Sequence, residues 1–314
     1  MVRPFDGVRV HAKAVVAEGW RTSTMTTILT AIVTGVAVLL AGNLPWAALG
    51  AWNLRIGTAV PWTILPMGLY LWAYWRFISG GWSALVDAAW YRANLRANRL
   101  PAGVWGPSLA AGALGFAALL ALLAVAARLV PLPSSAPIAT PPGMPVATTV
   151  LLLTMQSIVA GVTEEAAFRG YMQSPIERRY GLVIAILVNG TIFGLLHFSS
   201  HPRDVLMMLP YYVAVAAVYG GLTWAADSIL PALVLHSAGD IVVLTRWWAT
   251  GQPEWQLAAT PPPLVWEHGV DASFMLTATS ALLLAFLTAR AYRAVRNLRV
   301  RALAFAPAED PVAV

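Results

Sequence analysis

The sequence contains no cysteine and only one lysine, and charged residues of all kinds make up 11% of its 314 positions. The absence of cysteine excludes disulfides, a thiol nucleophile and a zinc site built on thiolates. A soluble domain carries about 25% charged residues, whereas here hydrophobic residues reach 59% and the mean hydropathy is +0.68. These values exclude an ordinary cytosolic enzyme, a disordered protein and a nucleic-acid-binding protein. We therefore expect the chain to lie in a membrane.

Long apolar runs predict an all-α, polytopic transmembrane bundle. A helix needs about 20 apolar residues to cross the hydrocarbon core of a bilayer. Eight runs meet this length, at 25–47, 57–75, 108–130, 147–172, 182–200, 205–226, 229–249 and 272–292.

The distribution of basic residues predicts that both termini are cytoplasmic. With the N-terminus inside, 15 basic residues fall on cytoplasmic segments and four on the opposite side, at Arg55, Arg128, Arg203 and Arg246. This asymmetry follows the positive-inside rule. We expect a multi-pass protein of a bacterial plasma membrane, with the lipid bilayer as its constant partner; the sequence does not predict an oligomeric state.

Residues 81–100 are predicted to form a helix at the membrane interface. On a continuous helix Arg92, Arg96 and Arg99 would share one face, and Trp82 and Trp90 would supply apolar surface. A solvated connecting helix is the alternative.

Polar residues inside the predicted spans are concentrated in the fourth, fifth and seventh. A charged group within a bilayer costs about 2.5 kcal/mol or more, so such groups usually face a cavity and mark a functional site. The residues concerned are Glu164, Glu165, Arg169, Asn189, His197, His236 and Asp240.

The fourth span carries two adjacent acids and an arginine. On a helix Glu165 and Arg169 are i, i+4 neighbours and can pair. Glu164 is rotated by about 100° from Glu165, so it cannot share that arginine equally and is free for chemistry. The alternative is that both acids only brace the helix.

The fifth span places Phe193 and His197 on one face, and Gly190 and Gly194 allow another helix to approach closely. The polar stretch 175–181 predicts a turn midway between Glu164 and His197. In a straight antiparallel hairpin these two residues would face each other.

The seventh span places His236 and Asp240 on one face, again at i, i+4. Such a pair can bind a metal together, or the carboxylate can orient the imidazole. An isolated polar pair that stabilises helix packing is the alternative.

These groups suit the activation of water in a low-dielectric site. In one scheme Glu164 is the general base for a water held with His197, and His236, steadied by Asp240, stabilises an oxyanion. In another, Glu164, His197 and His236 bind zinc with an open fourth position. The residue types allow both.

Glu164-Glu165-x-x-x-Arg169, Phe193-x-x-x-His197 and His236-x-x-x-Asp240 together resemble the three-motif signature of the CPBP family of intramembrane proteases. This family includes the type II CAAX prenyl endopeptidases and bacterial relatives. The resemblance implies a membrane-embedded endopeptidase, of a kind described both as a metalloprotease and as glutamate-dependent. It implies Glu164 as catalytic base working with His197, and His236 with residue 240 at the oxyanion or the metal.

The last motif position departs from the family pattern. It is often Asn in the prenyl endopeptidases and is Asp240 here. Asn donates a hydrogen bond to an oxyanion and an ionised Asp does not. Asp240 therefore favours orienting His236, binding metal or being protonated, and it argues against carrying over prenylated CAAX proteins as the substrate.

The predicted function is hydrolysis of a peptide bond in a membrane protein or membrane-associated peptide. The alternatives are a non-catalytic membrane protein, in a bacteriocin-immunity or scaffold role, and a proton-coupled transporter. The predicted organisation is a cytoplasmic segment (1–24), a transmembrane region with the interfacial helix (25–130), a Pro-rich linker (131–146), a protease-like core (147–249), a Pro-rich loop (250–271) and a last span with a basic cytoplasmic tail (272–314).

Overall fold

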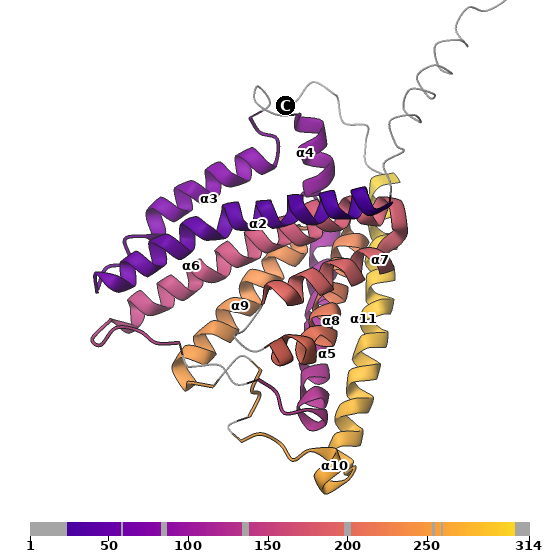
Figure 1. The fold of residues 1–314 in the computed structure, drawn as a ribbon. Helices are drawn as coiled ribbons and strands as arrows, with labels where there is room; N and C mark the ends of the chain where they lie inside the picture. Colours follow the sequence, from indigo (N-terminus) through magenta and orange to yellow (C-terminus); the bar gives the residue numbers. More distant parts are fainter. Residues whose placement is uncertain are drawn as a thin grey trace, which may run out of the picture.

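The computed structural model describes residues 24–57, 59–82, 87–133, 138–197, 202–252, 255–258 and 260–304. Most of the N-terminal segment, the middle of the Pro-rich linker, the end of the predicted fifth span and the end of the tail lie outside these ranges. The regular elements of the described ranges are helices throughout, which confirms the all-α prediction (Figure 1). They are α2 (Thr24–Arg55), α3 (Ile64–Ile78), α4 (Ala88–Leu95), α5 (Ala102–Leu129), α6 (Val146–Glu164), the π-helix η1 (Glu165–Met172), α7 (Gln173–Leu196), α8 (Pro202–Ala226), α9 (Leu230–Thr250), α10 (Val265–His268) and α11 (Ala272–Ala304).

Five helical segments in the described ranges are long and apolar enough to cross a membrane. They are Met25–Arg55, Ala102–Leu129, Val146–Leu196, Arg203–Ala226 and Ala272–Ala304. The third holds two predicted spans, and Gly181, with φ 81° and ψ 168°, breaks the helix between them. A multi-pass membrane protein is thus supported, whereas eight spans are not established.

The predicted spans at 57–75 and 229–249 are not among these five segments, for separate reasons. The 15 residues of α3 extend over only about 22 Å, less than the roughly 30 Å of a hydrocarbon core. The 21 residues of α9 are long enough, but this helix carries His236, Asp240 and Arg246 and is therefore less apolar.

The predicted interfacial helix is shorter than expected. Helix α4 begins after Asp87, whose carboxylate accepts hydrogen bonds from the backbone N–H of Ala89 and Trp90. It ends before Arg96, which adopts a left-handed backbone conformation with φ 56°. Arg96 and Arg99 therefore lie beyond the helix, and the predicted arginine face is not formed. Residues 83–86 of this prediction lie outside the described ranges.

The helices form two connected groups. Helices α5, α8 and α11 pack together, while α6 packs against α9 and α2, and α7 lies against α8 (Figure 1). Gly190 and Gly194 face α8, where a Cβ on Gly190 would lie 2.6 Å from the Cα of Val213. The predicted close helix approach at these glycines is present.

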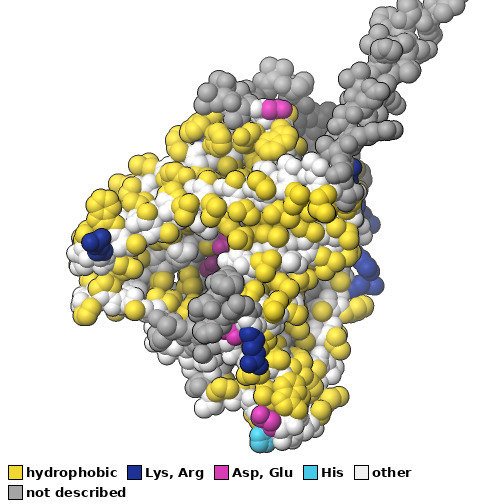
Figure 2. All heavy atoms as spheres, viewed as in Figure 1, with side chains coloured by type: hydrophobic (Ala, Val, Ile, Leu, Met, Phe, Trp, Pro, Cys, Tyr) yellow, Lys and Arg dark blue, Asp and Glu magenta, His cyan; other side chains and the backbone are white. Residues whose placement is uncertain are grey.

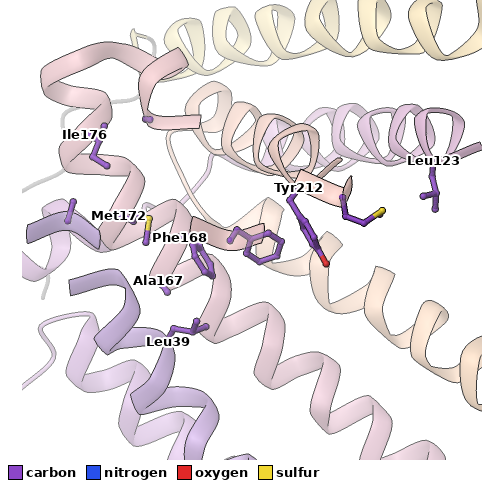
Figure 3. Packing of buried hydrophobic residues seen from close by; sticks show 11 residues of the cluster. Leu39, Leu123, Ala167, Phe168, Met172, Ile176 and Tyr212 are labelled. Carbon is purple, nitrogen blue, oxygen red and sulfur yellow. The ribbon is translucent and has the colours of Figure 1, made fainter. Parts of the chain in front are cut away.

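The buried core surrounds η1, all eight residues of which are buried. Figure 3 shows Phe168 and Met172 of η1 and Ile176 of α7 gathered with Leu39 of α2 and Tyr212 of α8. The outer face is mainly hydrophobic, and acidic side chains are recessed in a hollow of the face shown in Figure 2. The π-helix is thus held on several sides, which fixes the acids at its start.

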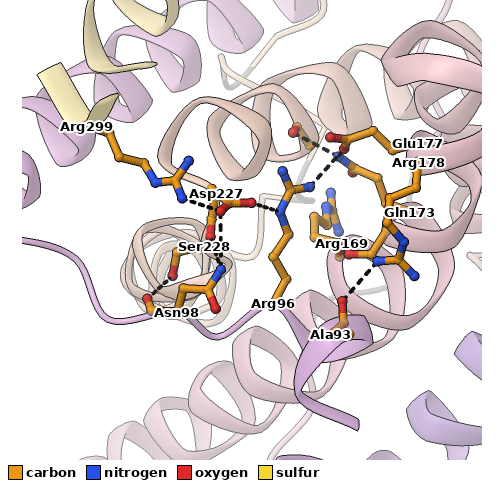
Figure 4. A network of polar contacts seen from close by, with 12 residues as sticks. Ala93, Arg96, Asn98, Arg169, Gln173, Glu177, Arg178, Asp227, Ser228 and Arg299 are labelled. Atoms are coloured by element: carbon orange, nitrogen blue, oxygen red, sulfur yellow. Dashed lines mark hydrogen bonds and ion pairs between the residues drawn. The ribbon is translucent and has the colours of Figure 1, made fainter. Parts of the chain in front are cut away.

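Two polar clusters lie outside this core. In the first, Arg96 binds Glu177 at 3.0 Å and Asp227 at 2.7 Å, and Arg299 of α11 also binds Asp227 (Figure 4). Burial alone would lower the pKa of Arg96, but the two carboxylates outweigh it and raise that pKa. This cluster joins the α4–α5 connection, α7, the α8–α9 turn and α11.

The second cluster joins the end of α5 to the start of α11. The Arg128 guanidinium donates to the Pro263 carbonyl at 2.6 Å and pairs with Asp271 at 2.8 Å. The hydrogen bond that Arg128 donates to the Asp271 carboxylate holds the pKa of Asp271 below its usual range.

Candidate active site

Glu165 is the buried centre of the site. Its side chain is fully buried, and its Oε1 lies 3.2 Å from Nη1 of Arg169 and 2.7 Å from Nδ1 of His236. The Glu165–Arg169 pair predicted from the spacing is present. It lies in the π-helix η1 rather than in the α-helix expected over 147–172. Such π-helical turns are rare and occur frequently at functional sites.

His236 is anchored to Glu165 through one ring nitrogen. An ionised carboxylate only accepts hydrogen bonds, so Nδ1 of His236 carries the proton in this contact. The other ring nitrogen, Nε2, lies 3.7 Å from Oε2 of Glu164 and 3.6 Å from Oδ2 of Asp240. His236 thus stands between one buried acid and two acids on its far side.

Glu164 and Asp240 are the more accessible acids. Their side chains are 15% and 32% exposed, against 0% for Glu165. Glu165 already binds Arg169 and His236, so Glu164 is the more accessible of the two adjacent acids; its chemical role stays a prediction.

Helix α9 reaches this position because α6 carries glycine where the two helices meet. A Cβ on Gly161 would overlap the Oγ of Ser237 and lie 3.0 Å from the Ser237 backbone nitrogen. The absence of a side chain at 161 therefore lets His236 approach the two glutamates, which lie one helical turn beyond Gly161.

His197 is exposed at the end of α7, where Nδ1 bonds the Phe193 carbonyl at 2.8 Å and the ring lies 4.9 Å from that of Tyr212. Among the described residues, the histidine that contacts Glu164 is His236. Helix α6 packs on α9 and α7 packs on α8, so α6 and α7 are not paired along their length as a straight hairpin requires. That Glu164 and His197 face each other stays a prediction.

The predicted residues nevertheless belong to one electrostatic environment. The carboxylate of Asp240 interacts through its charge with His236, Glu164, His197 and Glu165. Phe193 is buried, and its ring lies 4.9 Å from Phe168 and 4.3 Å from His197. Asn189, also buried, donates to the Phe168 carbonyl at 2.6 Å and so stabilises η1 rather than facing the acids.

Two features of the site were not predicted from the sequence. One is the Glu165–His236 hydrogen bond, and the other is Tyr219 of α8, whose ring stacks on His236 with centroids 5.1 Å apart. Neither has a local signal, because 71 residues separate the first pair and residues 219 and 236 lie on different helices. The close-packing Gly161 before the acids is the one local hint that another helix approaches there.

The predicted zinc site stays a prediction. Zinc needs His nitrogens and carboxylate oxygens at about 2.0–2.2 Å from a common centre. Within the described ranges, no three His, Asp or Glu side chains are grouped to hold a metal ion. His236 bonds Glu165 through Nδ1 and His197 bonds the Phe193 carbonyl through Nδ1, so Nε2 of each ring is the nitrogen left for a metal or a water.

Comparison with known proteins gives one family match. Residues 146–242 match the model of the family described as type II CAAX prenyl endopeptidase Rce1-like. The matched stretch includes α6, η1, α7, α8 and the part of α9 that carries His236 and Asp240. No curated protein and no solved structure matches the chain. Residues 146–242 are thus similar to the type II CAAX prenyl endopeptidase Rce1-like family, which agrees with the resemblance that the three motifs carry.

Proposed function

We propose that this protein is an intramembrane endopeptidase in which Glu164 activates water for attack on a peptide bond of a membrane-associated substrate. The observation that carries the proposal is the division between the two adjacent acids. Glu165 is buried and bound to Arg169 and His236, whereas Glu164 is partly exposed and faces Nε2 of His236 at 3.7 Å. The match to a prenyl endopeptidase family supports the reaction class.

In this mechanism Glu164 takes a proton from water as the water oxygen adds to the scissile carbonyl carbon. His197, whose Nδ1 is occupied by the Phe193 carbonyl, offers Nε2 as an acceptor that helps to hold the water. Protonated Glu164 then gives the proton to the leaving amine as the carbon–nitrogen bond breaks.

His236 stabilises the negative charge that develops on the carbonyl oxygen. In its doubly protonated form the ring donates from Nε2 while Nδ1 remains on Glu165. Asp240, 3.6 Å from Nε2, favours this form through its charge. Each carboxylate thus has a separate task, and no step requires a metal.

The test maps peptide termini by mass spectrometry in membranes from cells that express the wild type, Glu164→Gln or Glu267→Gln. Loss of a general base lowers the rate by about 10²–10⁴-fold, so termini made by the wild type should vanish with Glu164→Gln. Glu267 is exposed on α10, and its variant should leave them unchanged. Termini that persist with Glu164→Gln would contradict the proposal.

The same preparation separates the alternatives. A chelator should leave the termini unchanged, and a loss that added zinc reverses would favour the metal mechanism. A scaffold or immunity protein would keep its phenotype in Glu164→Gln. A transporter would instead move protons across liposomes that contain the purified wild type.

A further inference from the structure

We infer that Tyr219 is a positioning residue that holds the His236 ring in its working orientation; this inference rests on the proposed function. Tyr219 lies on α8 and is buried, with 7% of its surface exposed. Its ring is nearly parallel to that of His236, with an interplanar angle of 22° and centroids 5.1 Å apart. Tyr219 belongs to none of the three sequence motifs.

A single hydrogen bond does not fix an imidazole. The 2.7 Å bond from Nδ1 to Glu165 holds one atom of the ring, but the ring can still tilt about this contact. A flat aromatic surface against the imidazole restricts the tilt. The bond and the stacking together direct Nε2 toward Glu164 and Asp240.

Tyr219 also contacts the second group bound to Glu165. The guanidinium carbon of Arg169 lies 5.2 Å from the centroid of Tyr219 and 5.2 Å from that of Phe193. Nε and Nη2 of this buried arginine have no hydrogen-bond acceptor among the described residues, so the aromatic faces are a main source of stabilisation for its charge. One tyrosine ring therefore contacts both donors that converge on Oε1 of Glu165.

The chain offers matched variants. Tyr219→Phe keeps the ring and removes the hydroxyl, whereas Tyr219→Leu removes the flat surface and keeps a buried apolar side chain. Tyr292→Leu is the control, since Tyr292 is also 7% exposed but lies on α11 and donates to the Val218 carbonyl at 2.9 Å. Tyr219→Met replaces the leucine variant if that protein does not fold.

The experiment measures the His236 ring directly in the full-length protein. The chain has five histidines, so ¹⁵N-histidine labelling in detergent micelles gives few signals, and His236→Gln assigns the one required. The wild type, Tyr219→Phe and Tyr292→Leu should each show one ring state with Nδ1 protonated and ring protons shifted by stacking. Tyr219→Leu should lose both features, and its kcat for a mapped substrate should fall about 10- to 100-fold with KM unchanged.

Two results would overturn the inference: an unchanged His236 spectrum in Tyr219→Leu, or an equal loss of kcat in Tyr292→Leu. The spectrum does not depend on catalysis. If Glu164→Gln remained active, the proposed function would fail, but the His236 spectrum would still decide whether Tyr219 orients the ring.

Discussion

Burial separates the roles of two adjacent glutamates. Glu165 is fully buried between Arg169 and His236, and Glu164, one position earlier, is partly exposed. Neighbouring residues on a helix point in directions about 100° apart, so one can be a structural anchor while the next reaches the substrate. The two adjacent glutamates therefore lie in different surroundings within one site.

Removing Arg169 tests its ion pair with Glu165. Arg169→Met should destabilise the protein by about 3–5 kcal/mol, because it leaves Glu165 buried with one partner fewer. Combining it with Glu165→Gln should cost less than the sum of the two single changes, since the double variant buries no unpaired charge. Thermal unfolding of the four proteins in detergent measures this coupling.

The control for this cycle is Arg293→Met, at an exposed position of α11, which should leave the unfolding temperature unchanged. Strictly additive losses in Arg169→Met and Glu165→Gln would show that the two side chains do not act as a pair.

Part of the site can be predicted from the sequence because helical spacing is a local property. Glu165 and Arg169 can pair because they are four residues apart on a helix. Glu164 points away from this pair because it is adjacent to Glu165 and is rotated from it by about 100°. The contact between Glu165 and His236 depends on how α9 packs against α6, and the stacking of Tyr219 depends on α8. The residues of these two contacts lie on different helices and far apart in the sequence. No helical spacing links them, so the contacts are seen only in the three-dimensional structure.

At the scale of elements, the α6–α9 contact brings the motif of Glu164 and Glu165 against the motif of His236 and Asp240. Gly161 lies three residues before Glu164 and faces Ser237, the neighbour of His236. The Oγ of Ser237 is buried with no hydrogen-bond partner among the described residues. The small side chains at this crossing therefore serve close approach rather than hydrogen bonding.

We predict that Gly161→Ala reduces peptide cleavage and lowers stability by about 1–3 kcal/mol, as overpacking does. The new methyl group would overlap Ser237 Oγ, so adding Ser237→Ala should restore part of both properties. Gly68→Ala in α3 is the control, because a Cβ there meets no atom within 4 Å in the described structure. Cleavage rates and unfolding temperatures measure the effects, and failure of Ser237→Ala to restore either would contradict this account of the crossing.

The elements themselves were predictable to different degrees. Apolar length predicts α2, α5, α8 and α11, because each needs only to be long and hydrophobic. The π-helical geometry of η1 and the early end of α4 are set by tertiary contacts, such as the ion pairs that hold Arg96 in a left-handed conformation. Hydropathy carries no information on either.

At the scale of the whole molecule, the two polar clusters join distant parts of the chain that the positive-inside count assigns to opposite sides of the membrane. Arg96, Glu177, Asp227 and Arg299 are in contact and must lie at the same side. The positive-inside count assigns their segments to the cytoplasm. Arg128 and Asp271, which pair with each other, come from segments assigned to the opposite side.

This topology can be tested with single cysteines, since the chain has none of its own. Arg99→Cys and Val270→Cys change exposed positions near the first and second polar cluster. A membrane-impermeant maleimide should label Val270→Cys in intact cells and Arg99→Cys only in inverted vesicles. Labelling of both from the same side would contradict the predicted topology.

The turn between α8 and α9, which contains Asp227, gives a measure of how deep the site lies. Helix α9 begins at Leu230, just after this turn, and His236 lies six residues further along. At 1.5 Å per residue, the His236 Cα is about 9 Å from the start of the helix. An extended chain covers that depth with about three residues. Under the proposed function, a substrate anchored at the membrane surface near this turn would therefore need only a short unstructured end to bring its scissile bond to the depth of His236, without unwinding a complete transmembrane helix.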